Sequence, residues 1–334
     1  FDLTLSELES VLVENGFKKF NATQVFEGIY KQKVLRFDDI TNISKDLKKF
    51  LNENYEIKYL NILETLRSTD TNKYLLEVKG SSVEVVLMKQ SYGNSLCIST
   101  QIGCNMNCAF CESGRLKKQR DLTAGEIVLE VLTIEREEGI RVGNVVVMGI
   151  GEPFDNFTNL TRALDILTCP KGIDLGSRKI TVSTCGIVPK IKEFALLDTQ
   201  VNLAISLHAP NDNIRNKIMP ISRGYKMNEL MDSIDFYINK TNRRVTIEYI
   251  LLEGINDSVE NASELSRLLK GKLVYVNLIP YNPTRNEFKR SSQNRIEAFF
   301  DTLVKNNINV QKRREMGKNI KGACGQLKAS YERN

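Results

Sequence analysis

Three cysteines lie within eight consecutive residues of the chain, in the stretch TQIGCNMNCAFCESG that covers residues 100–114. They are Cys104, Cys108 and Cys111, and their spacing is C-x3-C-x2-C. Thiolates at such short spacing bind zinc or an iron–sulfur cluster. A closed zinc site takes four ligands, yet the only histidine, His208, lies about a hundred residues away, and no second C-x2-C pair exists. Three thiolates therefore fit a 4Fe–4S cluster whose fourth iron stays open to a small molecule.

The composition indicates a globular protein in a reducing compartment. The chain has 334 residues, of which 41% are hydrophobic and 26% charged, enough for one large domain and a small one. No apolar run approaches the roughly 20 residues of a membrane span, and the acidic first segment, FDLTLSELES, does not look like a signal peptide. We therefore expect a cytoplasmic protein without a membrane partner. The odd total of seven cysteines argues against a disulfide framework.

Positive charge is concentrated in three short runs, although the formal net charge is only +6. The runs are GRLKKQR (114–120), TRNEFKR (284–290) and QKRREMGKNIKG (311–322). A single basic run is most often a solvated surface. Because all three stand beside segments that carry candidate site residues, we predict a polyanionic substrate.

The elements that must position the cysteines follow from the hydrophobic periodicity. Near the N-terminus three apolar patterns have helical spacing, with candidate N-caps at Asn21 and Ser44. Strand-like runs follow, and later short β-rich runs alternate with helices, one of which opens with the capping box Thr123–Glu126. Such alternation makes a parallel sheet, and six or seven βα units fall short of the eight of a complete barrel.

We therefore predict an α/β fold, an incomplete (β/α)6-type barrel with a small N-terminal helical domain. The predicted divisions are a helical accessory domain (1–60), a β-extension (61–92), the barrel (93–312) and a C-terminal segment (313–334). Ligand sites of βα barrels lie at the carboxyl ends of the strands. The candidate segments at those ends are Gly149–Pro153, Ser183, Ser206–His208 and Asn282.

Seven motifs occur in the order seen in one enzyme family. They are LCISTQIGCNMNCAFC, VMGIGEP, STCGIVP, AISLHAPND, RVTIEYILLEGIND, LIPYNP and ACGQL. Over essentially its whole length, the chain resembles the RlmN/Cfr family of radical S-adenosylmethionine (SAM) rRNA adenine methyltransferases, and within it the adenine-C2 group. The cysteine triad, with Phe110 before its last member, resembles the signature of the wider radical SAM superfamily, whose fold is an incomplete barrel.

The resemblance implies two cofactors and the residues that hold them. Cys104, Cys108 and Cys111 would bind one 4Fe–4S cluster, whose open iron binds SAM and whose electron cleaves SAM to a 5′-deoxyadenosyl radical. Glu152 and Asn282 would meet the amino group and the ribose of SAM. The full set of implied SAM contacts is Gly151, Glu152, Ser183, Ser206, Leu207, His208 and Asn282. From the pattern alone, His208 would be a structural histidine at a strand end, with its ring hydrogen-bonded within the protein.

Two further thiols and a carboxylate take part in the implied reaction. Carbon 2 of adenine is electron-poor, so the methyl group is first loaded onto Cys324 and then added to the base as a radical, which creates a covalent protein–RNA adduct. Glu84 accepts the proton of the ring carbon, and Cys97 releases the product by forming a disulfide with Cys324. Two SAM molecules are used per methyl group. From the pattern alone, both cysteines would be structural and Glu84 would face outward from a strand; Cys169 and Cys185 match no chemical role, and we interpret them as structural.

The resemblance also implies the partners of the enzyme. Its substrate would be an adenosine in the peptidyl transferase centre of 23S rRNA, either protein-free or in an early assembly intermediate, and tRNA next to the anticodon stays open as a second substrate. The implied reductant is a flavodoxin- or ferredoxin-type protein, the helical domain would contact RNA, and we expect a monomer. Two alternatives stay open: a carbon-8 adenosine methyltransferase of the Cfr antibiotic-resistance type, which shares the cluster and both thiols, and a non-catalytic RNA-binding metalloprotein.

Overall fold

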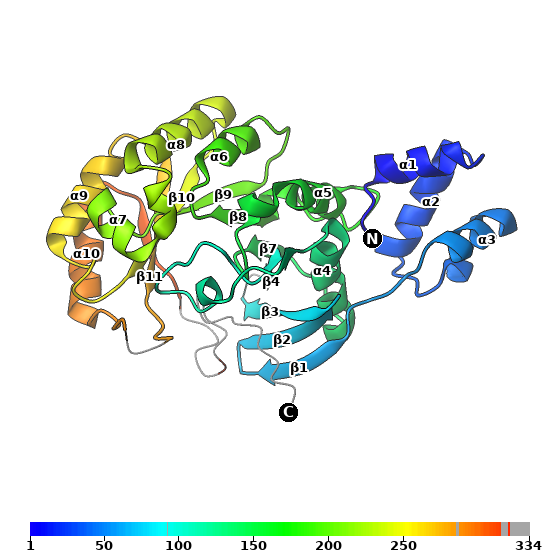
Figure 1. Cartoon of the computed structure of the whole chain (residues 1–334), viewed down its shortest axis with the longest axis horizontal. Helices are drawn as coiled ribbons and strands as arrows, with labels where there is room; N and C mark the ends of the chain where they lie inside the picture. Colours follow the sequence, from blue (N-terminus) through cyan, green and yellow to red (C-terminus); the bar gives the residue numbers. More distant parts are fainter. Residues whose placement is uncertain (92, 285–286, 315–319, 321–334) are drawn as a thin grey trace.

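Parallel strands form most of one mixed sheet in the computed structural model of the chain, which describes all residues except 92, 285–286, 315–319 and 321–334 (Figure 1). These strands are β4 (Gly93–Ile98), β7 (Asn144–Val147), β8 (Ile180–Thr184), β9 (Asn202–Ser206), β10 (Val245–Leu251), β11 (Val274–Pro280) and β12 (Val310–Lys312). They pair in this order, and each pair is parallel. Within the described residues β12 does not pair with β4, so the barrel is open, as predicted.

Helices connect the parallel strands, and most of them cover the outer side of the sheet (Figure 1). They are α4 (Ala124–Glu138), α5 (Phe157–Thr168), α6 (Val188–Ala195), α7 (Asp212–Ile218), α8 (Met227–Thr241), α9 (Val259–Leu269) and α10 (Gln293–Lys305). The predicted capping box of α4 is confirmed: Thr123 accepts the N–H of Glu126, whose carboxylate accepts the N–H of Thr123. None of the helices in the described part of the chain is both long enough and apolar enough to cross a membrane.

Three antiparallel strands extend the sheet beyond β4. They are β1 (Ile62–Arg67), β2 (Thr71–Val78) and β3 (Ser81–Gln90), and β3 pairs with β4. A separate short ribbon, formed by β5 (Gln101–Ile102) and β6 (Arg120–Asp121), brackets the cysteine loop. The strands therefore reach both sides of the segment that carries the three cysteines.

The N-terminal helices pack beside α4 and α5, at the end of the molecule opposite α9 and α10 (Figure 1). They are α1 (Leu5–Glu14), α2 (Lys19–Tyr30) and α3 (Lys45–Asn54). Ser44 caps α3, as predicted, because its hydroxyl accepts the N–H of Leu47 at 3.2 Å. The predicted cap of α2 is wrong: the helix begins two residues before Asn21, whose side chain instead accepts the N–H of Lys18 at 3.1 Å.

The two faces of the parallel sheet differ in chemistry. Residues that face the helices are apolar and belong to the main core; examples are Leu96, Val182, Leu203, Ile247 and Val276, each 0% exposed. Residues between them in the same strands face the inside of the barrel, and these include Cys97, Ser183, Ser206, Glu248 and Asn277. Because successive side chains of a strand point to opposite faces, one strand supplies both the core and the inner wall.

Candidate functional site

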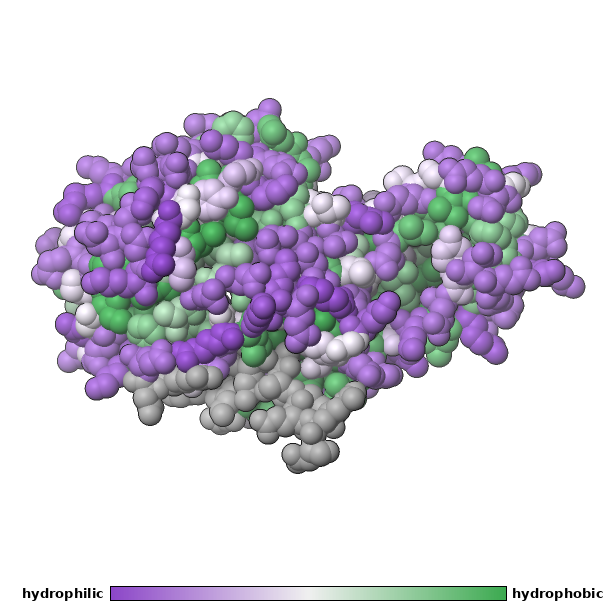
Figure 2. Space-filling view, viewed as in Figure 1, coloured by the Kyte–Doolittle hydropathy of each residue, from purple (hydrophilic) through white to green (hydrophobic). Residues whose placement is uncertain are grey.

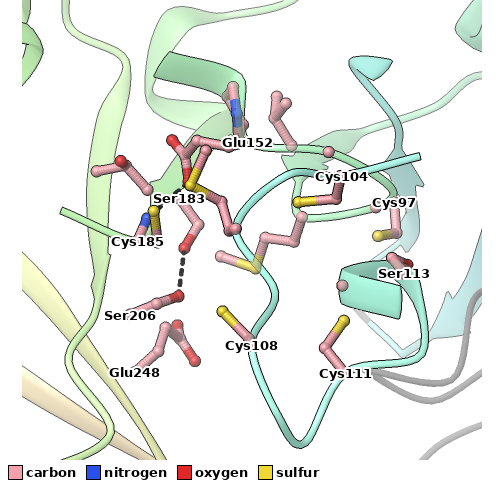
Figure 3. A pocket seen from close by; sticks show the side chains of 18 of the residues that line it. Cys97, Cys104, Cys108, Cys111, Ser113, Glu152, Ser183, Cys185, Ser206 and Glu248 are labelled. Carbon is pink, nitrogen blue, oxygen red and sulfur yellow. Dashed lines mark hydrogen bonds between the residues drawn. The ribbon is translucent and has the colours of Figure 1, made fainter. Parts of the chain in front are cut away.

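A pocket opens inside the barrel near the carboxyl ends of the parallel strands (Figure 3). The predicted residues that line it are Cys97, Cys104, Cys108, Cys111, Gly151, Glu152, Ser183, Ser206 and His208. Glu84, Leu207 and Asn282 are buried but are not part of the pocket lining that the described residues form. Cys324 lies outside the described residues. The structure thus brings most of the predicted site together.

The loop that carries the three cysteines is fixed at its base and in its middle. At the base, the N–H of Cys104 donates to the carbonyl of Leu116 at 2.8 Å. In the middle, the N–H of Ala109 donates to the carbonyl of Ile218 at 2.9 Å, which attaches the loop to the end of α7. These hydrogen bonds therefore define the path of the loop that carries the thiols, although the loop contains no long helix or strand.

The three thiols surround one space in the pocket (Figure 3). Burial raises the pKa of Cys104 to about 12 and raises that of Cys108 well above its ordinary value. Thiolates this buried need positive charge beside them, which metal ions supply. In the described part of the chain, no three or more His, Cys, Asp or Glu side chains are arranged to hold a single metal ion. In a cubane cluster each cysteine binds a different iron, and three thiols around one space match the three protein ligands of a cluster whose fourth iron is open.

The segment after β7 is a tight turn with two glycines. A Cβ atom on Gly149 would lie 2.6 Å from the carbonyl oxygen of Ile98. One on Gly151, whose φ is +104°, would lie 2.6 Å from the Cβ of Gln101. Neither position accepts a side chain, because the turn packs directly against residues 98–101, which lead from β4 into the cysteine loop.

Glu152 follows this turn and presents a buried carboxylate to the pocket. Its oxygens accept the backbone N–H groups of Cys185 at 2.7 Å and Phe154 at 2.9 Å. Burial raises its pKa, and these hydrogen bonds oppose the shift. A carboxylate held in this way is suited to bind an ammonium group, because its orientation is set before the ligand arrives.

The ends of β8 and β9 add two hydroxyls and the histidine. The hydroxyls of Ser183 and Ser206 lie 3.3 Å apart (Figure 3). His208 accepts the N–H of Ile250 on Nδ1 at 3.0 Å, and burial lowers its pKa to about 3. The ring is therefore neutral and carries its proton on Nε2. The ring of Phe110 packs edge-on against it, with centroids 4.9 Å apart, which joins the cysteine loop to β9.

Asn282 and Leu207 differ in what they can offer a ligand. No described residue donates to the Oδ1 atom of Asn282. An unpaired buried acceptor costs about 1–3 kcal/mol, so a ligand donor fits this position. Leu207 packs its side chain into the main core, and its N–H donates to the carbonyl of Glu248. Any contact of Leu207 with a ligand is therefore limited to its backbone.

Cys97 and Glu84 lie on the inner face of the sheet. Cys97 pairs with Val86 across β3 and β4, and both residues line the pocket. Glu84 stands two residues before Val86 on the same face of β3 and is only 6% exposed. The pattern-based interpretation of Glu84 as an outward-facing residue is therefore wrong. Lys73 of β2 forms an ion pair with this carboxylate at 2.8 Å, which offsets the cost of burying its charge.

Sequence reasoning missed three residues of this site. Glu248 of β10 lines the pocket and accepts a hydrogen bond from Asn277 at 2.8 Å. Cys185, which we interpreted as structural, also lines the pocket, and Arg215 is completely buried in α7. The alternation in VTIEYIL was a usable signal for Glu248, since it places the glutamate on the face opposite Ile247. No local pattern in the sequence indicated that Arg215 would be buried beside the site.

The basic run at 114–120 is largely paired with carboxylates in the fold. Its ion pairs are Arg115–Glu287, Lys118–Asp121, Lys118–Asp155 and Arg120–Glu126. Lys117, by contrast, is exposed. Hydrophilic side chains dominate this face of the molecule (Figure 2). The run therefore offers a polyanion less free positive charge than its sequence suggests.

Comparison with known proteins agrees with this geometry. Residues 98–265 match the family "Radical SAM superfamily", and residues 1–57 match "Ribosomal RNA large subunit methyltransferase N-terminal domain". The chain is 51% identical over 332 residues to a protein of Acholeplasma laidlawii named "Probable dual-specificity RNA methyltransferase RlmN", and the match covers 98% of each chain. A Spiroplasma citri protein of the same name is 52% identical over 338 residues, or 99% of this chain and 97% of the relative.

A solved structure is similar over nearly the whole chain. It is the crystal structure of a radical SAM methyltransferase from Sphaerobacter thermophilus, with a TM-score of 0.92 and 41% identity over 98% of both chains. The predicted fold and the family resemblance are thus confirmed, and membership of the superfamily implies a 4Fe–4S cluster and SAM as cofactors. The chain, with its cysteine loop inside an open barrel, belongs to the RlmN family of radical SAM RNA methyltransferases.

Proposed function

We propose that this enzyme methylates carbon 2 of an adenosine in 23S rRNA and, as a second substrate, an adenosine in tRNA next to the anticodon. The observation that carries the proposal is the position of Cys97, a thiol that lines the same pocket as the three cysteines of the loop. A cluster with one open iron needs only three thiolates. Of the two further thiols in this pocket, Cys185 is buried and Cys97 is partly exposed, which makes Cys97 the one suited to react with a second thiol. The dual-specificity names of the relatives support two RNA substrates.

The residues of the pocket fit the two cofactors. Cys104, Cys108 and Cys111 would hold the cluster, and SAM would be bound by Gly151, Glu152, Ser183, Ser206 and His208 of the pocket together with Asn282 outside its lining. When bound, the cluster and SAM supply a one-electron cleavage that yields a carbon radical able to take hydrogen from a methyl group. The buried Glu152 carboxylate would bind the amino group of SAM, the serine hydroxyls would donate to its carboxylate, and the Oδ1 atom of Asn282 would accept from a ribose hydroxyl. A flavodoxin- or ferredoxin-type protein of the cytoplasm would supply the electron.

Two cysteines and a glutamate of the chain carry the methyl group and the proton. The Cys324 thiolate takes a methyl group from a first SAM, forming a sulfur–carbon bond as the sulfonium bond breaks. When this methyl group has lost a hydrogen atom to the radical that the bound cofactors would supply, its carbon would bond to the base. Glu84 would then accept the ring proton, and the unpaired electron of the adduct would pass back to the oxidised cluster, which leaves a closed-shell thioether. Cys97 then attacks the sulfur of Cys324. The disulfide forms, the sulfur–carbon bond breaks, and the carbon takes a proton to become the methyl group; a thiol reductant restores both cysteines.

The carbon-2 assignment is favoured over carbon 8 by the spelling of three motifs. GEP, RSSQNRI and LHAPND resemble the carbon-2 group, while the cluster and both thiols are common to both reactions. The test is mass spectrometry of 23S rRNA and tRNA methylated in vitro, with the methyl group located on the base. A methyl group on carbon 8 would overturn the assignment, and protein without iron and sulfide after anaerobic purification would overturn the radical mechanism as a whole.

A pair of variants tests the roles of the two thiols. Cys97→Ala should still form the protein–RNA adduct but should be unable to resolve it, so the denatured protein keeps RNA and its absorbance at 260 nm until nuclease is added. Cys324→Ala should carry no RNA, and the double variant should match it, because resolution follows attachment. RNA bound to Cys324→Ala but not to Cys97→Ala would mean that the roles are reversed. RNA bound to neither would mean that no protein-bound intermediate exists.

A further inference from the structure

α7 carries an arginine that is completely buried. Arg215 is 0% exposed, and its Nη2 donates to the carbonyl of Cys185 at 2.6 Å. The same nitrogen lies 3.5 Å from the carbonyl oxygen of Ser206, and Nε donates to the carbonyl of Leu207 at 3.2 Å. These carbonyls stand where β8 and β9 end, so the guanidinium ties together two strand ends that line the pocket.

Arg215 donates no hydrogen bond to a carboxylate of the described residues, and Asp212 on the same helix acts on its charge only through space. All of its hydrogen bonds go to backbone carbonyls, and no described residue accepts from Nη1. The acid on the same helix, Asp212, accepts the N–H of Met227 instead. A guanidinium stays protonated in proteins, and an unpaired buried charge is strongly unfavourable. Carbonyl dipoles offset part of this cost, so a negative charge nearby would complete the site.

The cysteine loop rests on the same helix. Ala109 of the loop donates to the carbonyl of Ile218, and Cys108 and Phe110 pack in one apolar cluster with Ile218 and Met219. The carbonyl of Cys185, to which Arg215 donates, belongs to a residue that lines the same pocket as Cys108. In an apolar environment charges interact more strongly than in water, and salt screens them little. A cluster bound by these thiolates would therefore interact electrostatically with the positive charge of the guanidinium.

We propose that Arg215 is a positioning residue whose buried charge is the built-in counter-charge of the cluster and makes the cluster easier to reduce. The inference rests on the proposed cluster at Cys104, Cys108 and Cys111. Three thiolates make such a cluster anionic, and reduction adds a further negative charge. A fixed positive charge stabilises the reduced form more than the oxidised form, which raises the reduction potential.

The test is a redox titration of the cluster in anaerobically purified protein, followed by electron paramagnetic resonance and by absorbance. R215Q removes the charge but keeps amide donors for the carbonyl of Cys185, whereas R215K keeps the charge and loses the guanidinium shape. R223Q is the matched control, because Arg223 is exposed. At a fixed potential we expect about tenfold less reduced cluster in R215Q, which corresponds to a midpoint about 59 mV more negative. R215K and R223Q should stay within about twofold of the wild type.

The outcomes separate this inference from the proposed function. Wild-type protein without iron and sulfide would refute the cluster itself. A full cluster in R215Q with the wild-type potential would refute the counter-charge while leaving the proposed function intact. If the circular dichroism spectrum shows that R215Q is unfolded, while R215K is folded and its cluster keeps the wild-type midpoint potential, the need for a positive charge is supported. If both variants unfold, Arg215 acts only by holding the strand ends, and the inference is overturned.

Discussion

The inner and outer faces of the parallel sheet are built from the same strands but have opposite properties. In β9, Leu203 and Ile205 face the helices and are fully buried in the main core, while Ser206 faces the pocket. In β10 the same alternation separates Ile247 from Glu248. The outer face contributes apolar burial, about 1.5–3 kcal/mol for each large side chain. The inner face contributes groups that bind ligands. Adjacent residues of one strand therefore serve different purposes, one in the stability of the fold and the next in the chemistry of the site.

Burying the polar groups of the inner face costs free energy, and hydrogen bonds and ion pairs within the structure reduce this cost. Ser183 and Ser206 share a hydrogen bond, and Glu248 is bonded to Asn277. Glu84 is balanced by the ion pair with Lys73 described above. Buried polar groups with partners are tolerated, whereas groups without them are costly. Groups for which the described residues offer no partner, such as the Oδ1 of Asn282, are therefore where a ligand has most to add.

The largest effect should come from the inner face. Cys108→Ala removes one of three thiolates, so we expect loss of the iron–sulfur absorbance near roughly 400 nm and of SAM cleavage by more than about 100-fold. Iron analysis and the yield of 5′-deoxyadenosine measure both. Cys169→Ala is the control, because Cys169 packs against the main core and does not line the pocket. A Cys108→Ala protein with full iron content and normal cleavage would contradict the assignment of the cluster.

A pair of substitutions in β9 tests the division between the two faces. Leu203→Ala on the outer face should lower the free energy of unfolding by about 2–5 kcal/mol, since it leaves a cavity in the core. Ser206→Ala on the inner face should lower it by less than about 1.5 kcal/mol but should weaken SAM binding. Denaturant unfolding and equilibrium dialysis with SAM give the two quantities. Equal stability losses together with equal SAM affinities would show that the faces are not specialised.

The smallest effect is a pH dependence that arises from His208. Burial lowers its pKa to about 3, below the value of about 6.5 in an unfolded chain. The unfolded state therefore binds more protons between these values, so stability is lost as the pH falls through 6.5. We expect a loss of about 2 kcal/mol between pH 7 and pH 5. His208→Asn is the control, because asparagine tolerates the backbone φ of +56° but does not titrate; an equal pH dependence in this variant would assign the effect to other groups.

Local signals in the sequence were sufficient for much of the fold. The cap at Ser44 and the capping box at Thr123 stand where predicted, since both depend on side chains within three residues of the helix start. The cap at Asn21 failed because the same residue type also stabilises the first turn from inside the helix. The cysteine triad, the glycine turn and the strand-end residues were predicted from motifs and do line one pocket, apart from Leu207 and Asn282.

The sequence by itself determined the features that depend on residues close together in the chain. These are the spacing of the loop cysteines, the alternation of apolar and polar residues in the strands, and the order of the βα units. Only the tertiary structure decided the environment of charged groups. Glu84 is buried beside Lys73 of the neighbouring strand, and Arg215 is buried against the carbonyl of Cys185, 30 residues away. The physical reason is that burial and electrostatic energy depend on every atom within a few ångströms, and in a barrel most of these atoms come from segments distant in the chain.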